Sequence, residues 1–539
     1  MTDPRPISVP GFVNRWDGRI ARGLAFVAGT AVLLTLADPG ITIDEPLDVR
    51  PGRAYLSALR DHGFRFLTPP VVDLVYRDNK EHPPLGRWAL GLASTLIEPA
   101  EVLLAGPDPL GLYVLSGRVA PALVFAGLVW LVTRESGRRF GTLAGFAAGF
   151  SLIAMPRVFS HAHIAALDLF IAAAWTLAFL RAERALVGPD LSRKMAFAGL
   201  FWGLALLTKI QAWLLPPVVL GVALVRWGPR RSFVPLLLWT VVGLVVFFLG
   251  WPWLWADPVG RLRGYLGTGV DRVSIAVRYF GRVYRDRDVP WHFPWVYLAS
   301  TVPIGLQVLG LIGLARVARQ RDWGGVAIVG AATFVLAFFS TNVPIYDGER
   351  LFLLVFPLWS ILIGAGFASA WRWSCRWRSS RLLLGVILVA QLFGTISSHP
   401  FGLSYYNLAL GGLPGAQRLG MELAYWTEAV DPQLLRELAL RIGPNEVAAL
   451  APTLAPQQGL LMSGRSLVRR GFVLGDEDRA DSADWVIVSR REAYWKPELR
   501  SILHEGEVVV DRSRQGVWLA RLLRRGKRPT PPGQSSAGP

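Results

Sequence analysis

The stretch Ile41-Thr42-Ile43-Asp44-Glu45 carries two adjacent acidic residues directly after the apolar run from Leu24 to Ala37. That run has the composition of a membrane-crossing helix. A charge at the edge of the hydrocarbon is costly unless it is solvated or has a partner. Asp44 and Glu45 therefore either cap a helix in a solvated loop or provide a carboxylate that acts as a general base. The rest of the sequence favours the second interpretation.

The composition is that of a membrane protein, because 52% of the 539 residues are hydrophobic and only 18% are charged. The 22 tryptophans are consistent with anchoring at membrane interfaces. The net charge of +18 lies in short links between apolar runs and not in an aromatic-rich patch, which argues against nucleic acid as a partner and for anionic membrane lipid. The single Cys375 excludes an intrachain disulfide and a cysteine metal cluster.

About eleven apolar segments are predicted to cross the membrane, the first as an uncleaved span, with one or two of the short ones open as tilted, paired or re-entrant, so we expect an all-α polytopic membrane domain over residues 1–397. The segments are Arg22–Ala37, Leu115–Thr133, Gly141–Met155, Ile164–Leu180, Ala196–Leu207, Gln211–Val225, Phe233–Trp253, Trp295–Leu314, Val326–Phe339, Leu351–Ala370 and Leu382–Ile396. A twelfth apolar stretch, Leu85–Leu96, is short for a span and is expected to lie along the interface.

Basic residues predict the orientation of these spans. Five links rich in Arg and Lys all fall on one side, which the positive-inside rule assigns to the cytoplasm. The links contain Arg134/Arg138/Arg139, Arg181/Arg184/Arg193/Lys194, Arg226/Arg230/Arg231, Arg316/Arg319/Arg321 and Arg372/Arg376/Arg378/Arg381. The N-terminus is then cytoplasmic. The loops 38–114 and 254–294, and everything after Ser397, are predicted to lie outside a cell or inner membrane.

This orientation makes a prediction for reporter fusions. A reporter fused after Pro529 is expected to report the outer side, and one inserted at Arg376 the cytoplasm, because an odd number of crossings separates the two positions. Compartment-specific reporter activity measures both. The same compartment for both fusions would contradict the predicted spans.

After residue 397 the pattern changes to short apolar runs that alternate with helical stretches. We expect strands at Asn445–Leu450, Ala483–Val488, Glu507–Val510 and Gln515–Leu522, with helices at Pro432–Arg441 and Glu492–Leu503. Alternating strands and helices predict a small α/β domain over residues 398–526 on the outer side. The tail 527–539, rich in Pro, Gly, Ser and Arg, is predicted to be disordered.

Two motifs add titratable residues to the outer side. Lys80, Glu81 and His82 come directly before Pro83-Pro84. Lys80 can meet a phosphate, and Glu81 and His82 carry atoms that ligate divalent metals, so a divalent metal is an open alternative. The motif is otherwise a turn before an interfacial helix.

The second motif, Met155 to His163, contains His161 and His163 and is followed by Asp168. The two histidines are not zinc-like by themselves, because residues two apart diverge on a helix. An acidic residue such as Asp168 inside a span usually faces the bundle interior or a water-filled cavity. A structural ion pair with Arg157 is the equally weighted alternative.

Two cations, Lys209 and Arg350, are predicted to lie at outer helix ends. Arg350 follows the Asp347-Gly348-Glu349 turn, and a guanidinium held there can bind two phosphate oxygens. Surface pairs of Arg350 with Asp347 or Glu349, and snorkelling of Lys209, are the alternatives.

A further group follows the last span. Glycines, aromatic residues and amides there are suited to a sugar platform or to a compact turn. The residues concerned are Tyr405, Tyr406, Asn407, Glu422 and Trp426.

The sequence has neither the phosphate-binding loop of nucleotide hydrolases nor a dinucleotide-binding glycine motif. An activated substrate would therefore arrive in the membrane. A transporter or flippase is one rival class, but such proteins have related halves, and we find no internal repeat.

The motifs together resemble the protein O-mannosyltransferase and aminoarabinose transferase group, which are family 39 glycosyltransferases of the GT-C fold. The resemblance covers roughly residues 20–430 and rests on the order of its motifs. These are Asp44-Glu45, Glu81-His82-Pro83-Pro84-Leu85-Gly86, Pro156 to Asp168 and Asp347-Gly348-Glu349-Arg350 before Leu353-Leu354, with Leu403 to Trp426 as a further similar stretch.

The resemblance implies transfer of a sugar from a polyprenyl-phosphate carrier to an acceptor lipid, glycan or protein on the outer side. It also implies that Asp44, next to Glu45, is catalytic. Lys80, Lys209 and Arg350 are placed to take up the charge of the leaving phosphate. A single base further suggests inversion at the sugar. An oligosaccharyltransferase or glycan ligase of the same fold is the second rival.

Overall fold

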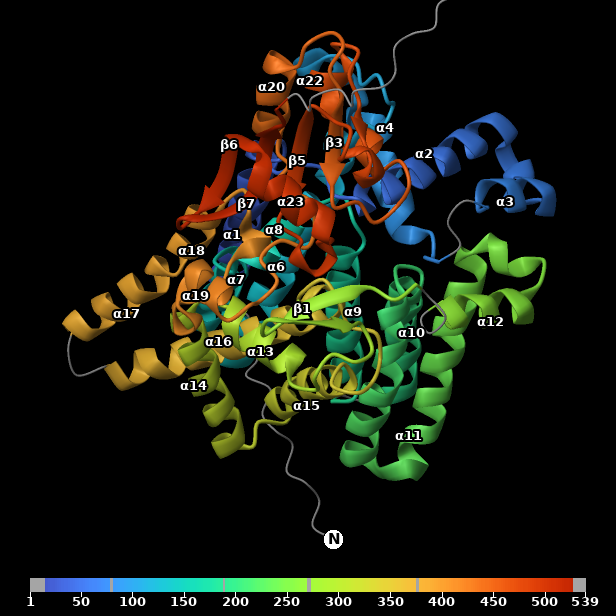
Figure 1. Cartoon of the computed structure of the whole chain (residues 1–539). Helices are drawn as coiled ribbons and strands as arrows, with labels where there is room; N and C mark the ends of the chain where they lie inside the picture. The colour runs from blue at the N-terminus through green and yellow to red at the C-terminus, as the bar shows by residue number, and fades with distance from the viewer. Residues whose placement is uncertain (1–14, 78–80, 188–189, 269–272, 375–377, 527–539) are drawn as a thin grey trace, which may run out of the picture. The chain divides into compact units, whose positions relative to one another are not determined.

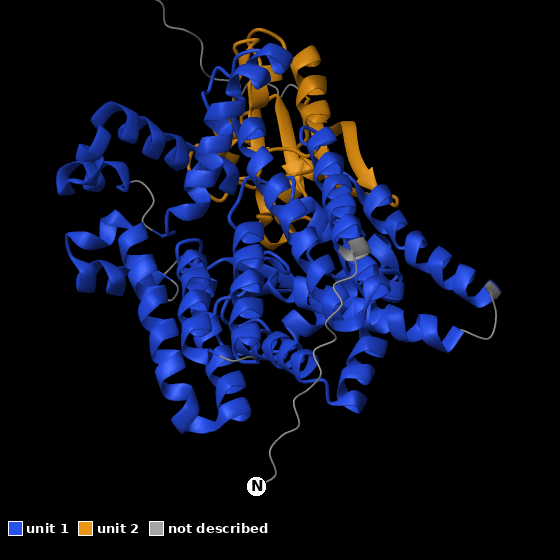
Figure 2. Ribbon diagram, turned by 180° about the vertical axis from the view of Figure 1, so that it is seen from behind, with its two compact units in different colours: residues 1–38, 44–422 blue, residues 39–43, 423–539 orange. Residues whose placement is uncertain are grey.

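A computed structural model describes residues 15–77, 81–187, 190–268, 273–374 and 378–526. The chain divides into two compact units, Met1–Asp38 with Asp44–Glu422 and Pro39–Ile43 with Leu423–Pro539 (Figure 2). Residues 398–422, assigned to the C-terminal domain by the sequence, group with the first unit. Lys80 and the predicted disordered tail 527–539 lie outside the described residues.

The first unit consists mainly of helices (Figure 1). They are α1 (Arg15–Leu34), α2 (Asp44–His62), α3 (Pro69–Val75), α4 (Leu85–Ala105), α5 (Val114–Gly117), α6 (Val119–Phe140), α7 (Thr142–Ile153), α8 (Pro156–His161), α9 (Asp168–Ala185), α10 (Leu191–Leu206), α11 (Leu215–Gly250), α12 (Pro258–Thr268), α13 (Phe293–Thr301), α14 (Ile304–Gln320), α15 (Trp323–Phe338), α16 (Val355–Trp373), α17 (Arg378–Ala390), α18 (Leu392–Ser398) and α19 (Gly412–Arg418). Short 3-10 turns lie between them, namely η1 (Gly63–Leu67), η2 (Ile210–Leu214), η3 (Pro252–Trp255), η4 (Arg350–Phe352), η6 (Gly402–Ser404) and η7 (Leu408–Leu410).

Every segment predicted to span the membrane overlaps a helix, but fewer helices have the length and apolarity of a span. Among the described residues, four stretches qualify, or five if one bent pair is a single span. They are Leu85–Ala105, Val114–Phe140, Ile210–Gly250 and Ser379–Ser398, with Phe293–Thr301 and Ile304–Gln320 as the pair, bent by 116°. These helices give a multi-pass protein, and the count of eleven stays a prediction.

The stretch Leu85–Leu96 is longer than expected. It continues as α4 to Ala105, which is long and apolar enough to cross a membrane. Glu98 and Glu101 interrupt the apolar pattern of the sequence after Leu96, but in the structure both carboxylates have hydrogen-bond partners. Glu98 accepts a hydrogen bond from Arg53 at 2.9 Å, and Glu101 accepts one from the Ser116 amide at 2.7 Å. The prediction of a short interfacial segment is therefore wrong in length.

The expectation of an all-α membrane domain is wrong at one place, the loop 254–294. After α12 the chain forms an antiparallel hairpin of β1 (Ala276–Tyr279) and β2 (Arg282–Arg285), in which Ala276 pairs with Arg285. The two turn residues, Phe280 and Gly281, have φ of 46° and 76°. Two positive φ values in a two-residue loop match the twist of a hairpin.

The start of α2 rests on a small apolar core. Val49 of α2 packs with Leu90 of α4, Ala120 of α6 and a stretch around α9, all buried. Gly52 of α2 and Gly91 of α4 face each other so closely that a Cβ on either would overlap the backbone of the other helix. This close approach fixes α2, and with it Asp44, against α4.

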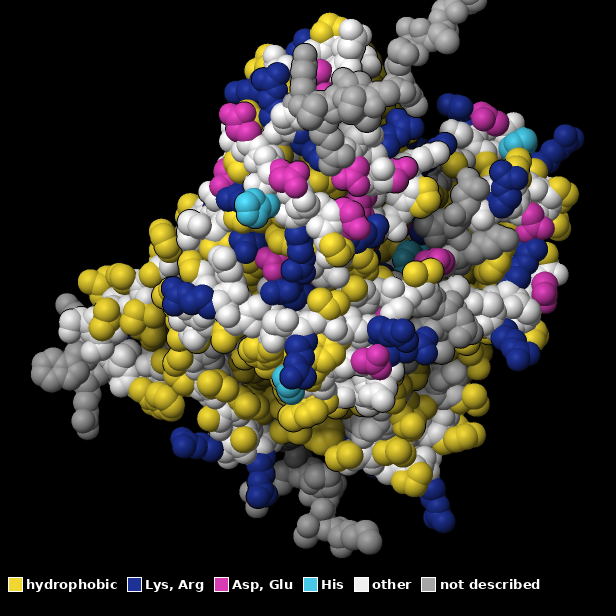
Figure 3. All heavy atoms as spheres, viewed as in Figure 1, with side chains coloured by type: hydrophobic (Ala, Val, Ile, Leu, Met, Phe, Trp, Pro, Cys, Tyr) yellow, Lys and Arg dark blue, Asp and Glu magenta, His cyan; other side chains and the backbone are white. Residues whose placement is uncertain are grey.

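Several helices expose apolar side chains, as expected for contact with lipid. On α17, Leu382 is 72% and Val386 55% exposed. Figure 3 shows hydrophobic side chains gathered there, at the left of the view. The hydrophobic surface supports membrane embedding of the first unit.

The second unit contains a mixed five-stranded sheet in the order β4-β3-β5-β7-β6. β3 is parallel to β4 and β5, whereas β7 is antiparallel to β5 and β6. The strands are β3 (Ala448–Ala451), β4 (Leu474–Gly475), β5 (Trp485–Ser489), β6 (Glu507–Arg514) and β7 (Val517–Arg524). The helices are α20 (Pro432–Arg441), α21 (Gln458–Leu461), α22 (Gly464–Val468) and α23 (Pro497–Glu505), with 3-10 turns η8 (Glu477–Arg479) and η9 (Glu492–Tyr494).

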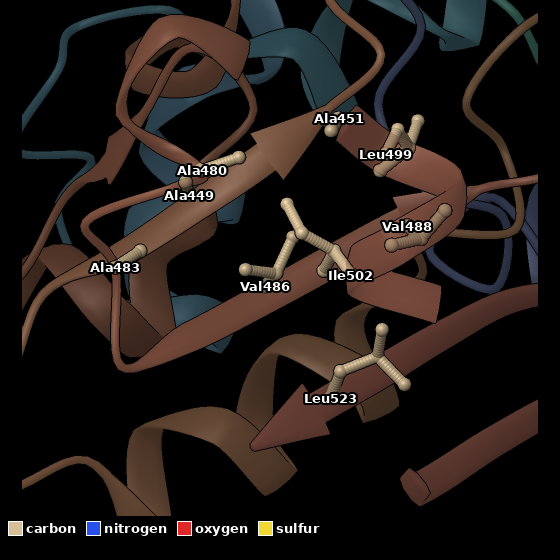
Figure 4. Packing of buried hydrophobic residues seen from close by; sticks show 9 residues of the cluster. All are labelled: Ala449, Ala451, Ala480, Ala483, Val486, Val488, Leu499, Ile502 and Leu523. Carbon is tan, nitrogen blue, oxygen red and sulfur yellow. The ribbon is translucent and has the colours of Figure 1, made fainter. Parts of the chain in front are cut away.

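The core of the second unit lies between the sheet and α23. Val486 and Val488 of β5 meet Leu499 and Ile502 of α23, with small alanines on β3 (Figure 4). All five residues of the central strand β5 are buried and four of them are apolar, which is typical of a strand covered on both faces. The four predicted strands and the α/β character of this unit are confirmed.

Candidate active site

Arg350 is the centre of the candidate site. Its side chain is 9% exposed and contacts three carboxylates from three parts of the chain. Nε donates to Asp168 at 3.1 Å, Nη1 donates to Asp347 at 3.2 Å, and Nη2 contacts Asp44. Asp44 and Asp168 each begin a helix, where the helix dipole stabilises a negative charge. The fold thus brings Asp44, Asp168 and Arg350 together, all three named from the sequence.

Lys209 extends this cluster. Its ammonium lies 2.6 Å from the second oxygen of Asp168, and both side chains are buried. Asp168 therefore bridges Arg350 and Lys209 and holds the two cations near each other. Among these groups Asp44 is the most accessible, with 21% of its side chain exposed. A cluster with two fixed cations beside an accessible carboxylate is suited to binding an anion next to a base.

Glu45 has a different environment from its neighbour Asp44. Its two oxygens accept from Nε and Nη2 of Arg118 at 2.6 and 2.8 Å, and one also accepts from the Ala165 amide at 2.9 Å. Both side chains are fully buried. These contacts tie the start of α2 to Arg118, which directly precedes α6.

Replacing Glu45 by glutamine is expected to destabilise the protein, because the charge of Arg118 would stay buried without its counter-ion. Removing one partner of a buried pair costs about 3–5 kcal/mol. Thermal unfolding of the purified protein in detergent measures this. An unchanged midpoint would contradict it, and Arg53→Gln is the control, because it breaks a more exposed ion pair, between Arg53 of α2 and Glu98 of α4.

His82 lies close to the cluster and Glu81 is exposed. Burial lowers the pKa of His82 well below its usual value, and the positive charges of Arg87, Lys209 and Arg350 lower it further. His82 is therefore neutral and supplies no charge to the site. Within the described residues, no group of three or more His, Cys, Asp or Glu side chains is arranged to hold a metal ion.

A second buried cluster contains Glu349, the residue directly before Arg350 in the sequence. Glu349 contacts Nη1 of Arg157 at 2.5 Å and Nε2 of His161 at 3.5 Å. Burial alone would raise the pKa of Glu349, but the guanidinium of Arg157 holds it below its usual value. His161 thus belongs to this cluster. His163 lies elsewhere, between Thr35 Oγ1 at 2.8 Å and the Phe159 carbonyl at 2.9 Å.

The predicted sugar platform is largely buried in the first unit. Asn407 donates to the carbonyls of Ala299 and Val302 at 2.7 and 2.8 Å, and the hydroxyl of Tyr406 donates to the Glu422 carbonyl at 2.7 Å. These contacts fix the 405–407 segment on α13. Trp426 belongs to the second unit, where it is buried beside Tyr425.

Sequence reasoning missed two buried pairs. Arg118 was not singled out, although an arginine within a predicted span is a signal by itself. Asp48 and Arg87, 2.9 Å apart, link α2 to α4. Burial raises the pKa of Asp48 to about 6, against the opposing effect of Arg87. Asp48 and Arg87 belong to no recognisable motif, because the two partners are far apart in the sequence.

Comparison with known proteins agrees with this architecture. Residues 81–255 match the family model described as dolichyl-phosphate-mannose-protein mannosyltransferase. No curated protein matches the chain. The crystal structure of ArnT from Cupriavidus metallidurans in the apo state is similar, with a TM-score of 0.51, 16% identity, and 93% of this chain and 97% of that chain covered.

A second ArnT structure from the same organism, bound to undecaprenyl phosphate, gives a TM-score of 0.48 with the same identity and coverage. The family match and the ArnT-like fold bear out the resemblance found in the sequence. The chain has the GT-C fold of ArnT, and its similarity to the family 39 glycosyltransferases lies in residues 81–255.

Proposed function

We propose that this protein is an integral-membrane glycosyltransferase that moves a sugar from a polyprenyl-phosphate carrier to an acceptor on the extracytoplasmic side. The observation that carries the proposal is the contact of Arg350 with Asp44, supported by Lys209 on the far side of Asp168. Arg350 is a cation that can bind a phosphate, and it lies beside Asp44, a carboxylate that can accept the proton of a hydroxyl group. The matching family model is named for a dolichyl-phosphate-mannose donor, which has this chemistry.

Arg350 and Lys209 are the proposed phosphate-binding groups. All three nitrogens of the Arg350 guanidinium contact carboxylates. Asp168 and Asp347 are more deeply buried than Asp44, so Nη2, the nitrogen that faces Asp44, is the one a phosphate oxygen reaches. Donor binding would therefore replace Asp44 on this nitrogen and leave its carboxylate available to the acceptor.

Asp44 is the proposed general base. The acceptor hydroxyl attacks the anomeric carbon, its proton passes to Asp44, and the bond from that carbon to the phosphate oxygen breaks. The leaving polyprenyl phosphate keeps the electron pair, and Arg350 and Lys209 stabilise its charge. Attack opposite the leaving group inverts the anomeric centre. The acceptor is a lipid, a glycan or a protein.

The direct test is consumption of a synthetic polyprenyl-phosphate sugar by the purified full chain. We expect release of free polyprenyl phosphate that depends on an added acceptor extract. Mass spectrometry of surface glycans in a deletion strain then identifies the missing sugar and its acceptor. A protein that moves the lipid-linked sugar between leaflets without cleaving it would contradict the proposal and indicate a flippase.

A further inference from the structure

Arg157 joins three parts of the first unit in one buried cluster. Nη1 contacts Glu349 at 2.5 Å, and Nε donates to the Tyr405 carbonyl at 3.0 Å. The guanidinium carbon lies 4.7 Å from the ring centre of Tyr406, within reach of a cation–π interaction. Arg157 and Glu349 are 1% and 0% exposed. A buried charge keeps its partner, because separation would leave both in a low-dielectric interior.

Tyr406 fixes the far end of this cluster. Its hydroxyl donates to the Glu422 carbonyl at 2.7 Å and lies 3.3 Å from the hydroxyl of Tyr297 on α13. Arg157 therefore rests on a segment that is itself held in place. Glu349 is therefore held in position by Arg157, which lies outside the 347–350 turn.

Glu349 directly precedes Arg350 in a tight turn. Asp347 and Gly348 have φ of 55° and 64°, so the chain reverses sharply before η4. The Glu349 side chain is bound to Arg157, whereas the Arg350 side chain is bound to the carboxylates of the candidate site. Two consecutive side chains with partners in different clusters fix the rotation of the backbone between them.

We propose that Arg157 and Glu349 are positioning residues, which hold the backbone of the 347–350 turn so that the Arg350 guanidinium is ready for a lipid-linked phosphate. The inference rests on the proposed function, in which Arg350 binds that phosphate. Neither residue touches the donor. Their effect passes through Arg350, since a fork of nitrogens binds two phosphate oxygens only in one orientation.

The test is a titration of the purified full chain with undecaprenyl phosphate, beside its thermal unfolding in the same detergent. Glu349→Gln keeps the shape of the side chain and removes its charge. We expect roughly 10–100-fold weaker binding, the loss in affinity that follows when one hydrogen bond between charged groups is misaligned. Arg157→Lys keeps the charge but cannot bond Glu349 and the Tyr405 carbonyl as a fork, so we expect its affinity to lie between wild type and Arg157→Ala.

Glu183→Gln is the matched control. It breaks the Arg139–Glu183 pair, also 2.5 Å long, which joins α6 to α9 and does not contact Arg350. We expect lower stability but wild-type affinity. Wild-type affinity in Glu349→Gln and Arg157→Ala, with a loss of stability like that of the control, would overturn the inference and leave the proposed function intact. Should Glu349→Gln not fold, Arg157→Lys decides in the same way. Absence of binding by the wild type would overturn both.

Discussion

Replacing Asp44 by asparagine is expected to lower turnover of a polyprenyl-phosphate sugar by about 10²–10⁴-fold, the usual contribution of a general base. Asparagine keeps the shape of the side chain and can still accept a hydrogen bond from Arg350, but it cannot take a proton from an acceptor hydroxyl. The amount of folded protein should stay normal, because Asp44 is the most exposed member of the cluster. The release of polyprenyl phosphate measures turnover.

The same variant separates catalysis from donor binding. Asp44 and the donor phosphate compete for the same nitrogen of Arg350 in the proposed mechanism. Removing the charge of Asp44 should therefore leave the affinity for undecaprenyl phosphate unchanged or raise it, while turnover falls. Asp347→Asn is the control, because Asp347 also contacts Arg350 but is more deeply buried than Asp44 and is not the proposed base. Near-wild-type turnover in Asp44→Asn would remove Asp44 as the base.

Replacing Arg350 is expected to weaken donor binding, with alanine more damaging than lysine. A hydrogen bond to a charged group contributes about 1.5–3 kcal/mol, so alanine should lose roughly 10–100-fold in affinity. Lysine keeps the charge but offers no fork, and should fall between alanine and wild type. Alanine should also lower stability, since Asp168 and Asp347 would each lose a buried ion pair with Arg350.

Titration of undecaprenyl phosphate against the three proteins measures this series. Arg53→Ala is a suitable control, because it removes another arginine of the first unit, one that pairs with Glu98 instead of the carboxylates around Arg350. Equal affinities for wild type, Arg350→Lys and Arg350→Ala would exclude Arg350 from the site. A stability change without an affinity change would mean that Arg350 serves only to neutralise its acidic neighbours.

The sequence by itself determined the membrane class of the first unit and the α/β class of the second. The spacing of apolar side chains along the chain is a local property, and it can be recognised without a structure. Pro432–Arg441 was therefore predicted as a helix, and α20 has those bounds. The sequence also named Asp44, Asp168, Lys209 and Arg350 separately, because each is a charge at the edge of an apolar run. Rare charges next to hydrocarbon are visible without a structure.

Only the tertiary structure decided which of these charges meet. Glu45 and Asp44 are neighbours in sequence, yet one pairs with Arg118, 73 positions away, and the other with Arg350, 306 positions away. The extent of α4 was likewise decided at a distance, because Arg53 and Ser116 satisfy the acidic residues that interrupt its apolar pattern. A local pattern shows that a charge needs a partner, but the partner is chosen by the packing of helices far apart in the chain.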